Sequence, residues 1–325
     1  MHKHKLGFTI AYIKLHIAIL LFGFTAILGK LISLEQIGLV WNRLWISSLG
    51  LIVLPGVIHG LKLLRKQDLW RFAGIGILVA IHWITFYGSI KLGNNASITL
   101  ACLATTPLFT SVLEPFVSKR RILKIEVLLG IITIIGVYFV TGAGSFYYPA
   151  IVTAIISAFF ASIFSTLNKK YIAHHNAMSV SFVELFSGWL FIGCLLPVYF
   201  KTEPNFSLIP TGKHALDQWN FTSLGIDSDW YYLILLGLLC TSLAFVYSLQ
   251  ALKYVSAFTS NLAINLEPVY GIILATYIFN ENKELNFEFY LGACIILSCV
   301  VLHPILQKVE KRRERNAKPT SHHPV

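Results

Sequence analysis

Apolar stretches of about twenty residues recur along the whole chain, and a helix of that length crosses the roughly 30 Å core of a bilayer. The lipid offers no hydrogen-bond partner to the backbone, so each stretch is expected to be helical. The sequence predicts an all-α integral membrane protein of ten transmembrane helices. The ten stretches are 11–31, 38–58, 71–91, 95–117, 122–142, 147–168, 178–200, 230–252, 255–279 and 286–306.

The composition excludes several other classes of protein. Hydrophobic residues make up 56% of the chain and charged residues 13%, which does not fit a soluble enzyme, a disordered chain or a fibrous protein. The net charge of +11 falls in short clusters between apolar stretches, so the lipid bilayer, and not a nucleic acid, is the expected partner. The five cysteines all lie in apolar stretches, and we expect no disulfide framework, metal site or cofactor.

The distribution of lysine and arginine predicts the orientation in the membrane. With the N-terminus inside, the inner segments hold 20 of the 26 basic residues. This bias predicts a multi-pass protein of the cell (inner) membrane with both termini cytoplasmic. The first apolar stretch resembles a signal peptide but lacks a small-residue cleavage site, so we interpret it as a retained helix.

The two halves of the chain resemble each other. Gly93–Phe109 aligns with Tyr254–Tyr270, which places Pro107 opposite Pro268, each in the middle of a predicted helix. Five helices is an odd number, so the second repeat would enter the membrane from the opposite side. We therefore predict two inverted repeats, with a cytoplasmic N-terminus at 1–10, repeats at 11–142 and 147–306, and a disordered basic cytoplasmic tail at 307–325.

One segment resembles a known family. Leu266–Glu281, LEPVYGIILATYIFNE, is similar to the signature of the EamA-type drug/metabolite transporter family, in which a Glu-Pro pair opens the second half of the ninth helix. Phe22–Lys30 resembles the family's first helix, and Arg43 lies where the family places an arginine. Ser157–Lys170 resembles the start of the second repeat. The first repeat departs from the family pattern, because Glu114 lies earlier than the usual helix-ending glutamate.

The resemblance implies a secondary transporter, not an enzyme, that exports small metabolites such as amino acids by alternating access. A proton gradient or a substrate gradient would drive it, and a homodimer is compatible with this plan. A flippase for a lipid-linked intermediate is the first alternative. An intramembrane enzyme, which needs a catalytic pair at one depth, and a channel, which needs a continuous polar pore, are the others.

Glu267 is the leading candidate for the substrate or proton pathway. It lies near the middle of the ninth stretch, where an ionised side chain costs a few kcal/mol unless it is paired or hydrated. Pro268 frees the carbonyl of Ile264, so a carboxylate and a free carbonyl come together near the midplane. The alternative is a carboxylate that caps neighbouring backbone or pairs with Lys30 or Arg43.

Other polar residues lie near the two prolines. Asn261 and Asn265 share one helix face, and they either line a cavity or bridge helices. Thr105 and Thr106 precede Pro107, which frees the carbonyl of Leu103. The alternative for each threonine is a hydrogen bond back to its own helix.

His82 lies near the centre of the third stretch, where it either relays a proton or stays neutral and hydrogen-bonded inside the bundle. Trp83, Tyr87 and Tyr247 form an aromatic wall around a ligand or simply pack. Glu184 has no basic residue within a helical turn, which favours a functional role.

Two basic residues are assigned to the outer end of the bundle. Lys30 and Arg43 would bind anionic groups there or pair with Glu35 or Glu281.

Overall fold

The computed structural model describes residues 2–119, 121–141, 148–203, 206–210, 228–279 and 286–317. The regular structure in these ranges is helical throughout. Within them, six helical stretches are long and apolar enough to cross a membrane: Gly7–Leu31, Lys66–Gly93, Ile98–Ser118, Tyr148–His174, Ala177–Thr202 and Asp229–Leu252. A shorter apolar helix, Phe287–Cys299, follows. The all-α membrane fold is therefore confirmed, whereas the count of ten spans stays a prediction.

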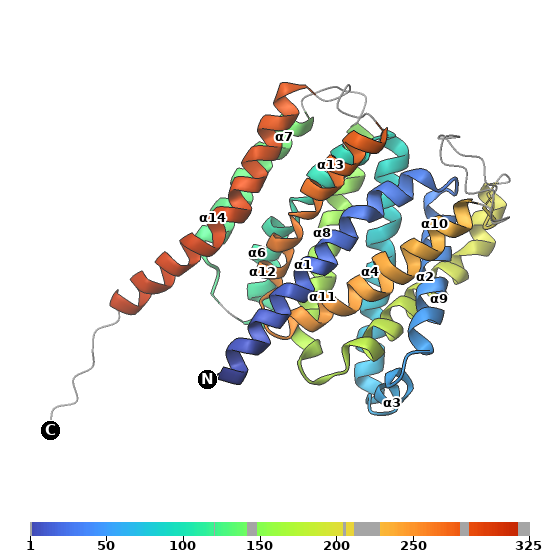
Figure 1. Cartoon of the computed structure of the whole chain (residues 1–325), viewed down its shortest axis with the longest axis horizontal. Helices are drawn as coiled ribbons and strands as arrows, with labels where there is room; N and C mark the ends of the chain where they lie inside the picture. Colours follow the sequence, from blue (N-terminus) through green and yellow to red (C-terminus); the bar gives the residue numbers. More distant parts are fainter. Residues whose placement is uncertain are drawn as a thin grey trace.

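The helices pack into one bundle with a separate pair along its edge (Figure 1). Helix α4 packs against α8 and α9, α1 packs against α11 and α13, and α7 and α14 form the edge pair. A π-helical turn, Leu238–Leu243, joins α10 to α11. The α-helices are α1 His2–Leu31, α2 Gln36–Ile52, α3 Val57–Lys62, α4 Lys66–Gly93, α5 Ala96–Leu103, α6 Thr106–Ser118, α7 Lys124–Thr141, α8 Tyr148–Tyr171, α9 Ala177–Thr202, α10 Ser228–Gly237, α11 Ala244–Leu252, α12 Ala257–Ile264, α13 Glu267–Phe279 and α14 Phe287–Ala317.

Two of the predicted helices are broken in the middle. The stretch 95–117 forms α5 and α6, separated at Ala104 and Thr105, and the stretch 255–279 forms α12 and α13, separated at Asn265 and Leu266. Each second half begins one residue before a proline. Proline cannot donate the helical hydrogen bond but is favoured in the first turn of a helix, so it ends one helix and starts the next.

Two helix ends differ from the prediction. Helix α2 ends at Ile52, six residues early, and a turn at Gly56 with φ of 88° leads into α3. Glycine accepts this left-handed conformation without strain. Helix α14 continues to Ala317, so the prediction that the tail is disordered from residue 307 is wrong for 307–317. That segment is rich in lysine, arginine and glutamate, which are good helix formers. Residues 318–325 lie outside the described ranges.

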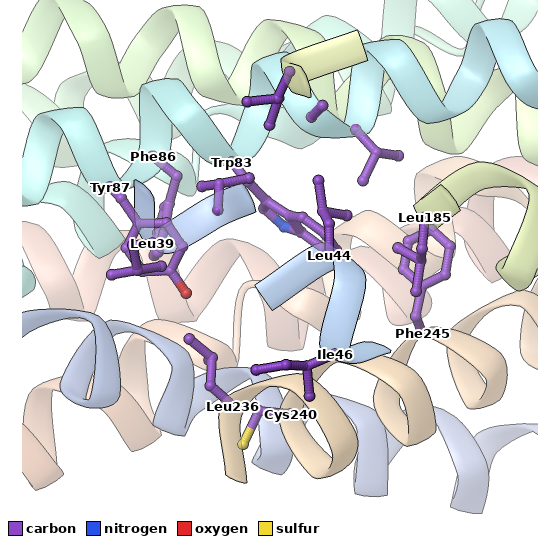
Figure 2. Packing of buried hydrophobic residues seen from close by; sticks show 14 of the residues in the cluster. Leu39, Leu44, Ile46, Trp83, Phe86, Tyr87, Leu185, Leu236, Cys240 and Phe245 are labelled. Atoms are coloured by element: carbon purple, nitrogen blue, oxygen red, sulfur yellow. The ribbon is translucent and has the colours of Figure 1, made fainter. Parts of the chain in front are cut away.

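The core of the bundle is apolar and tightly packed (Figure 2). Leu44 from α2, Trp83 from α4 and Phe245 from α11 belong to one buried cluster. Small residues allow the closest contacts between helices. In a membrane the hydrophobic effect does not drive helices together, so their association depends on such close packing. A Cβ added at Gly76 of α4 would overlap the carbonyl oxygen of Glu184 in α9. These two backbones can therefore approach only because residue 76 is glycine.

This contact generates a stability prediction. Gly76→Ala should lower the melting temperature of the purified protein, because overpacking costs about 1–3 kcal/mol. The matched control is Gly74→Ala on the same helix, where an added Cβ meets nothing within 4 Å. The control should be neutral or stabilising by up to about 1 kcal/mol, since alanine favours helix over glycine. Equal melting temperatures of the two variants in detergent would contradict the packing argument.

Candidate functional site

A cavity of about 910 Å³, its open mouth included, lies where the two broken helices are interrupted. Ala104 and Thr106 line it from the first break, and Asn265 and Glu267 line it from the second. Helices α1, α2, α4, α8 and α11 supply the remaining walls. Both breaks therefore contribute backbone and polar side chains to one site.

Side chains hold the two breaks against each other. The Nδ2 group of Asn265 donates to the carbonyl oxygen of Ala104 at 3.2 Å, across the two repeats. The hydroxyl of Thr106 donates at 2.7 Å to the carbonyl oxygen of Leu103, which Pro107 leaves without its helical donor. Helices α6 and α13 begin at the cavity, and a helix N-terminus carries a partial positive charge. The site therefore favours an acidic group beside each helix start.

Arg43 supplies a fixed cation to the cavity. It is only 1% exposed, and its Nε and Nη1 groups donate to the hydroxyls of Thr241 at 2.5 Å and Tyr87 at 2.7 Å. Its guanidinium lies 3.9 Å from the centroid of the Trp83 ring. The suggested ion pair with Glu35 does not form, and Glu281 lies outside the described residues. Arg43 thus faces the cavity and is not confined to the outer end.

Glu267 supplies an acid to the same cavity. It is the first residue of α13 and is 6% exposed. Within the described ranges its carboxylate has no ion pair with Lys30 or Arg43 and no hydrogen-bond partner. The helix start stabilises its negative charge. A cation and an acid therefore face one cavity without neutralising each other by direct contact.

Two more predicted residues line the cavity and are anchored from behind. The Nδ1 atom of His82 lies 2.9 Å from the carbonyl oxygen of Ser157 and 2.8 Å from its hydroxyl, which fixes the ring against α8. The Nδ2 group of Asn261 donates to the hydroxyls of Thr110 at 2.8 Å and Ser165 at 2.7 Å. Both residues thus bridge helices and line the cavity at once. Asn261 therefore combines the two roles that the sequence left open for it, whereas a proton relay at His82 stays a prediction.

Three of the predicted residues do not line the cavity. Tyr87 lies behind Arg43 and positions it, and the hydroxyl of Thr105 donates back to the carbonyl oxygen of Cys102 at 2.9 Å. Tyr247 packs elsewhere, with the ammonium of Lys14 5.8 Å from its ring centroid. Of the three aromatic residues predicted to form a wall, Trp83 lines the cavity, whereas Tyr87 and Tyr247 make other contacts.

The remaining predicted residues lie around the site. Glu184 is fully buried beside the cavity and accepts a hydrogen bond from the Nδ2 group of Asn168, which does line it, at 3.1 Å. Lys30 is half-buried near the end of α1, away from the cavity lining. Pro107 starts α6 behind the lining, and the side chain of Pro268 lies outside the described part.

The sequence did not single out several lining residues. Asn168 and the apolar residues Phe22, Phe164 and Phe245 line the cavity, and Thr241 holds Arg43 from behind. Aromatic residues in membrane helices are common, so their pattern carried no signal. The polar residues Asn168 and Thr241 inside apolar stretches were the available signal.

The cavity extends toward the end of the bundle that carries the N-terminus. Asn168 and Leu252 line this end, and Lys14 of α1 donates to Gln250 of α11 at 2.6 Å at the same level. At the opposite end of the bundle, Asp229 accepts hydrogen bonds from the amide of Ser33 at 3.1 Å and from its hydroxyl, which ties α10 to the segment after α1.

The geometry around Arg43 generates a prediction. Tyr87→Phe removes one acceptor of the buried guanidinium and should lower the melting temperature, since an unmet hydrogen bond of a buried group costs about 1–3 kcal/mol. Tyr277→Phe removes the same atom from a side chain that is 83% exposed, and it should leave the melting temperature unchanged. A Tyr87→Phe protein as stable as this control would show that Tyr87 does not support Arg43.

Comparisons with known proteins agree with this architecture. The model of the EamA-like transporter family matches residues 9–142 and 148–303. The chain is 28% identical to the uncharacterized transporter YetK of Bacillus subtilis (strain 168), over 98% of this chain and 92% of that protein. It is 22% identical to an uncharacterized transporter of Clostridium kluyveri, over 73% of this chain and 74% of that protein.

A solved protein crystal structure shares the fold. The TM-score is 0.64 at 17% identity, and the match covers 92% of this chain and 98% of that one. The family match spans most of the residues of this chain, in two segments. The chain therefore belongs to the EamA-like transporter family.

Proposed function

We propose that this membrane transporter exports zwitterionic small metabolites such as amino acids, by alternating access and driven by a proton or substrate gradient. One observation carries the proposal. Arg43 and Glu267 face the same cavity without a mutual ion pair, and Trp83 and Phe245 form apolar walls around them. An amino acid carries the complementary set: a carboxylate, an ammonium group and a side chain.

The chemistry of each partner supports this assignment. The substrate carboxylate would accept hydrogen bonds from Arg43, whose planar guanidinium suits carboxylates. The ammonium group would donate to Glu267, and charge-assisted hydrogen bonds are stronger than neutral ones. The side chain would lie against Trp83, Phe164 and Phe245. Binding of a zwitterion would thereby neutralise both buried charges. A ligand that carries only one charge would leave either Arg43 or Glu267 unpaired in the cavity, and an unpaired buried charge is costly.

The transport mechanism is supported by the two broken helices and by the cavity that both of them line. We propose ten spans in two inverted repeats, 11–142 and 147–306, with both termini cytoplasmic in the inner membrane. The end of the cavity at Asn168 and Leu252 would then lie toward the cytoplasm, and the contact between Ser33 and Asp229 would close the outer end. Rocking of the repeats would break this contact and open the site outward.

The alternatives receive less support from the site. A lipid flippase would need an apolar groove that accepts chains, whereas two charged residues lie at the centre of this cavity. An intramembrane enzyme would need a free nucleophile. Ser157 lies near His82, but it is fully buried and its hydroxyl donates to the carbonyl oxygen of His82 at 2.9 Å. A channel would need a pore that stays open at both ends.

Efflux from proteoliposomes loaded with L-phenylalanine tests the proposal. Phenylalanine amide lacks the carboxylate and N-acetylphenylalanine lacks the ammonium group, so each should leave roughly tenfold more slowly or worse, since a hydrogen bond to a charged group contributes about 1.5–3 kcal/mol. In Glu267→Gln the discrimination against N-acetylphenylalanine should shrink while that against the amide persists.

Glu288→Gln is the matched control, since Glu288 is an exposed acid at the start of α14, away from the cavity. It should discriminate as the unmodified protein does. Equal efflux of the three compounds would refute zwitterion recognition. If no soluble compound leaves but a fluorescent lipid changes leaflet, the flippase is the correct reading. Repeating the efflux with and without a proton gradient identifies the driving force.

A further inference from the structure

Glu184 is a buried acid whose charge is not neutralised by any ion pair among the described residues. Its side chain is fully buried between helices, and its only hydrogen-bond partner there is the Nδ2 group of Asn168. The Oε1 atom of Glu184 and the Oδ1 atom of Asn168 have no partner in the described part of the chain. Burying an unpaired, ionised carboxylate between membrane helices costs several kcal/mol. This cost favours the protonated, neutral form of the side chain.

The amide of Asn168 suits both protonation states of the acid. Its Nδ2 group donates to the carboxylate, as in this structure. After rotation about the last side-chain bond, its Oδ1 atom can accept the hydrogen of a protonated carboxyl group. Asn168 also lines the cavity. It therefore connects a site that can hold a proton with the space that admits water and substrate.

The position of Glu184 repeats that of Arg43. Each is the eighth residue of its helix, α2 or α9. A Cβ on Gly76 would overlap the carbonyl oxygen of Glu184, and one on Gly237 would lie 3.5 Å from the carbonyl oxygen of Arg43.

The spacing between these glycines equals that between Pro107 and Pro268. The two segments that match the family begin at residues 9 and 148, which are 139 residues apart, close to the 141 residues between Arg43 and Glu184. One repeat thus places a fixed cation at this position, and the other places an acid.

We propose that Glu184 is the proton-binding site of the transport cycle. The carboxylate binds one proton when the site faces the side of higher proton concentration, and the carboxyl group releases it to a water molecule in the cavity beside Asn168 when the opposite side is open. No other covalent bond changes. The inference rests on the proposed function, and it assigns the coupling proton to a residue outside the substrate contacts of Arg43 and Glu267.

The charged and titratable groups on the elements around Glu184 are engaged elsewhere or lie at the helix ends. Asp68 of α4 pairs with Arg65 and Arg71, and His82 contacts Ser157. Lys169 of α8 donates to the carbonyl oxygen of Leu252, and Lys253 donates to that of His175. The other charged groups, histidines and cysteines on these elements include Arg43 of α2, held by Tyr87, Lys66 at the start of α4, Lys91 near its end, which donates to the carbonyl oxygen of Ile32, Lys170 of α8, His59 and Lys62 of α3, His174 and His175 after α8, and Cys194 and Lys201 of α9.

Glu184→Gln in proteoliposomes tests the proposal with L-phenylalanine and the pH dye pyranine. Exchange of labelled for unlabelled phenylalanine without a gradient should persist, because the substrate contacts remain. Accumulation driven by a proton gradient, and the proton flux that accompanies it, should fall to the level of protein-free vesicles. Glu288→Gln should keep both activities. Asn168→Leu should slow proton flux more than exchange.

Each other outcome overturns the proposal. Gradient-driven accumulation that survives in Glu184→Gln excludes Glu184 as the coupling site, and loss of exchange as well makes it a structural residue. If the glutamine variant does not fold, Glu184→Asp keeps an acid, and an unchanged pH profile of transport would exclude the role. Failure of the proposed function looks different, because the unmodified protein would then move no phenylalanine.

Discussion

The two proline-broken helices are the constraint on which the rest of this structure depends. A proline in a membrane helix leaves a backbone carbonyl without its donor, and lipid cannot replace that donor. The chain meets this requirement by placing the breaks together inside the protein, where Asn265 donates to Ala104 and Thr106 donates to Leu103. Once the breaks meet, polar backbone and two helix starts surround one space. The cavity therefore lies where the two helix breaks come together inside the protein.

Close helix packing keeps that space in place. Glycine at position 76 lets α4 approach the backbone of α9 at Glu184, and glycine at position 237 lets α10 approach Ile46 of α2. Buried hydrogen bonds then orient the individual groups, as Tyr87 and Thr241 do for Arg43. A cavity with charged walls is expensive in a membrane protein. Its cost is offset when a ligand supplies the opposite charges, which connects the architecture to transport.

The proposed division of labour separates substrate from proton. Arg43 and Glu267 line the cavity, whereas Glu184 lies behind the lining residue Asn168, which donates a hydrogen bond to it. A separate proton site avoids competition between the substrate ammonium and the proton for one carboxylate. Arg43 and Glu184 occupy matching positions in the two halves of the chain. In the proposed repeats, the same position therefore carries a cation in one half and an acid in the other. The contact between Ser33 and Asp229 would form the closed end that the proposed alternating access requires.

The sequence by itself determined that the chain is helical and crosses a membrane, because twenty-residue apolar stretches allow no other hydrogen-bonding solution. It also identified Glu267, Asn261 and His82, since polar groups are conspicuous in such stretches. Only the tertiary structure decided which of them meet. Helical periodicity specifies a face but not the neighbour, so Arg43 could not be placed in the cavity, nor Tyr247 outside it. The meeting of the two breaks, the cavity between them and the link from Asn168 to Glu184 depend on contacts between segments that are distant in the sequence, and those exist only after packing.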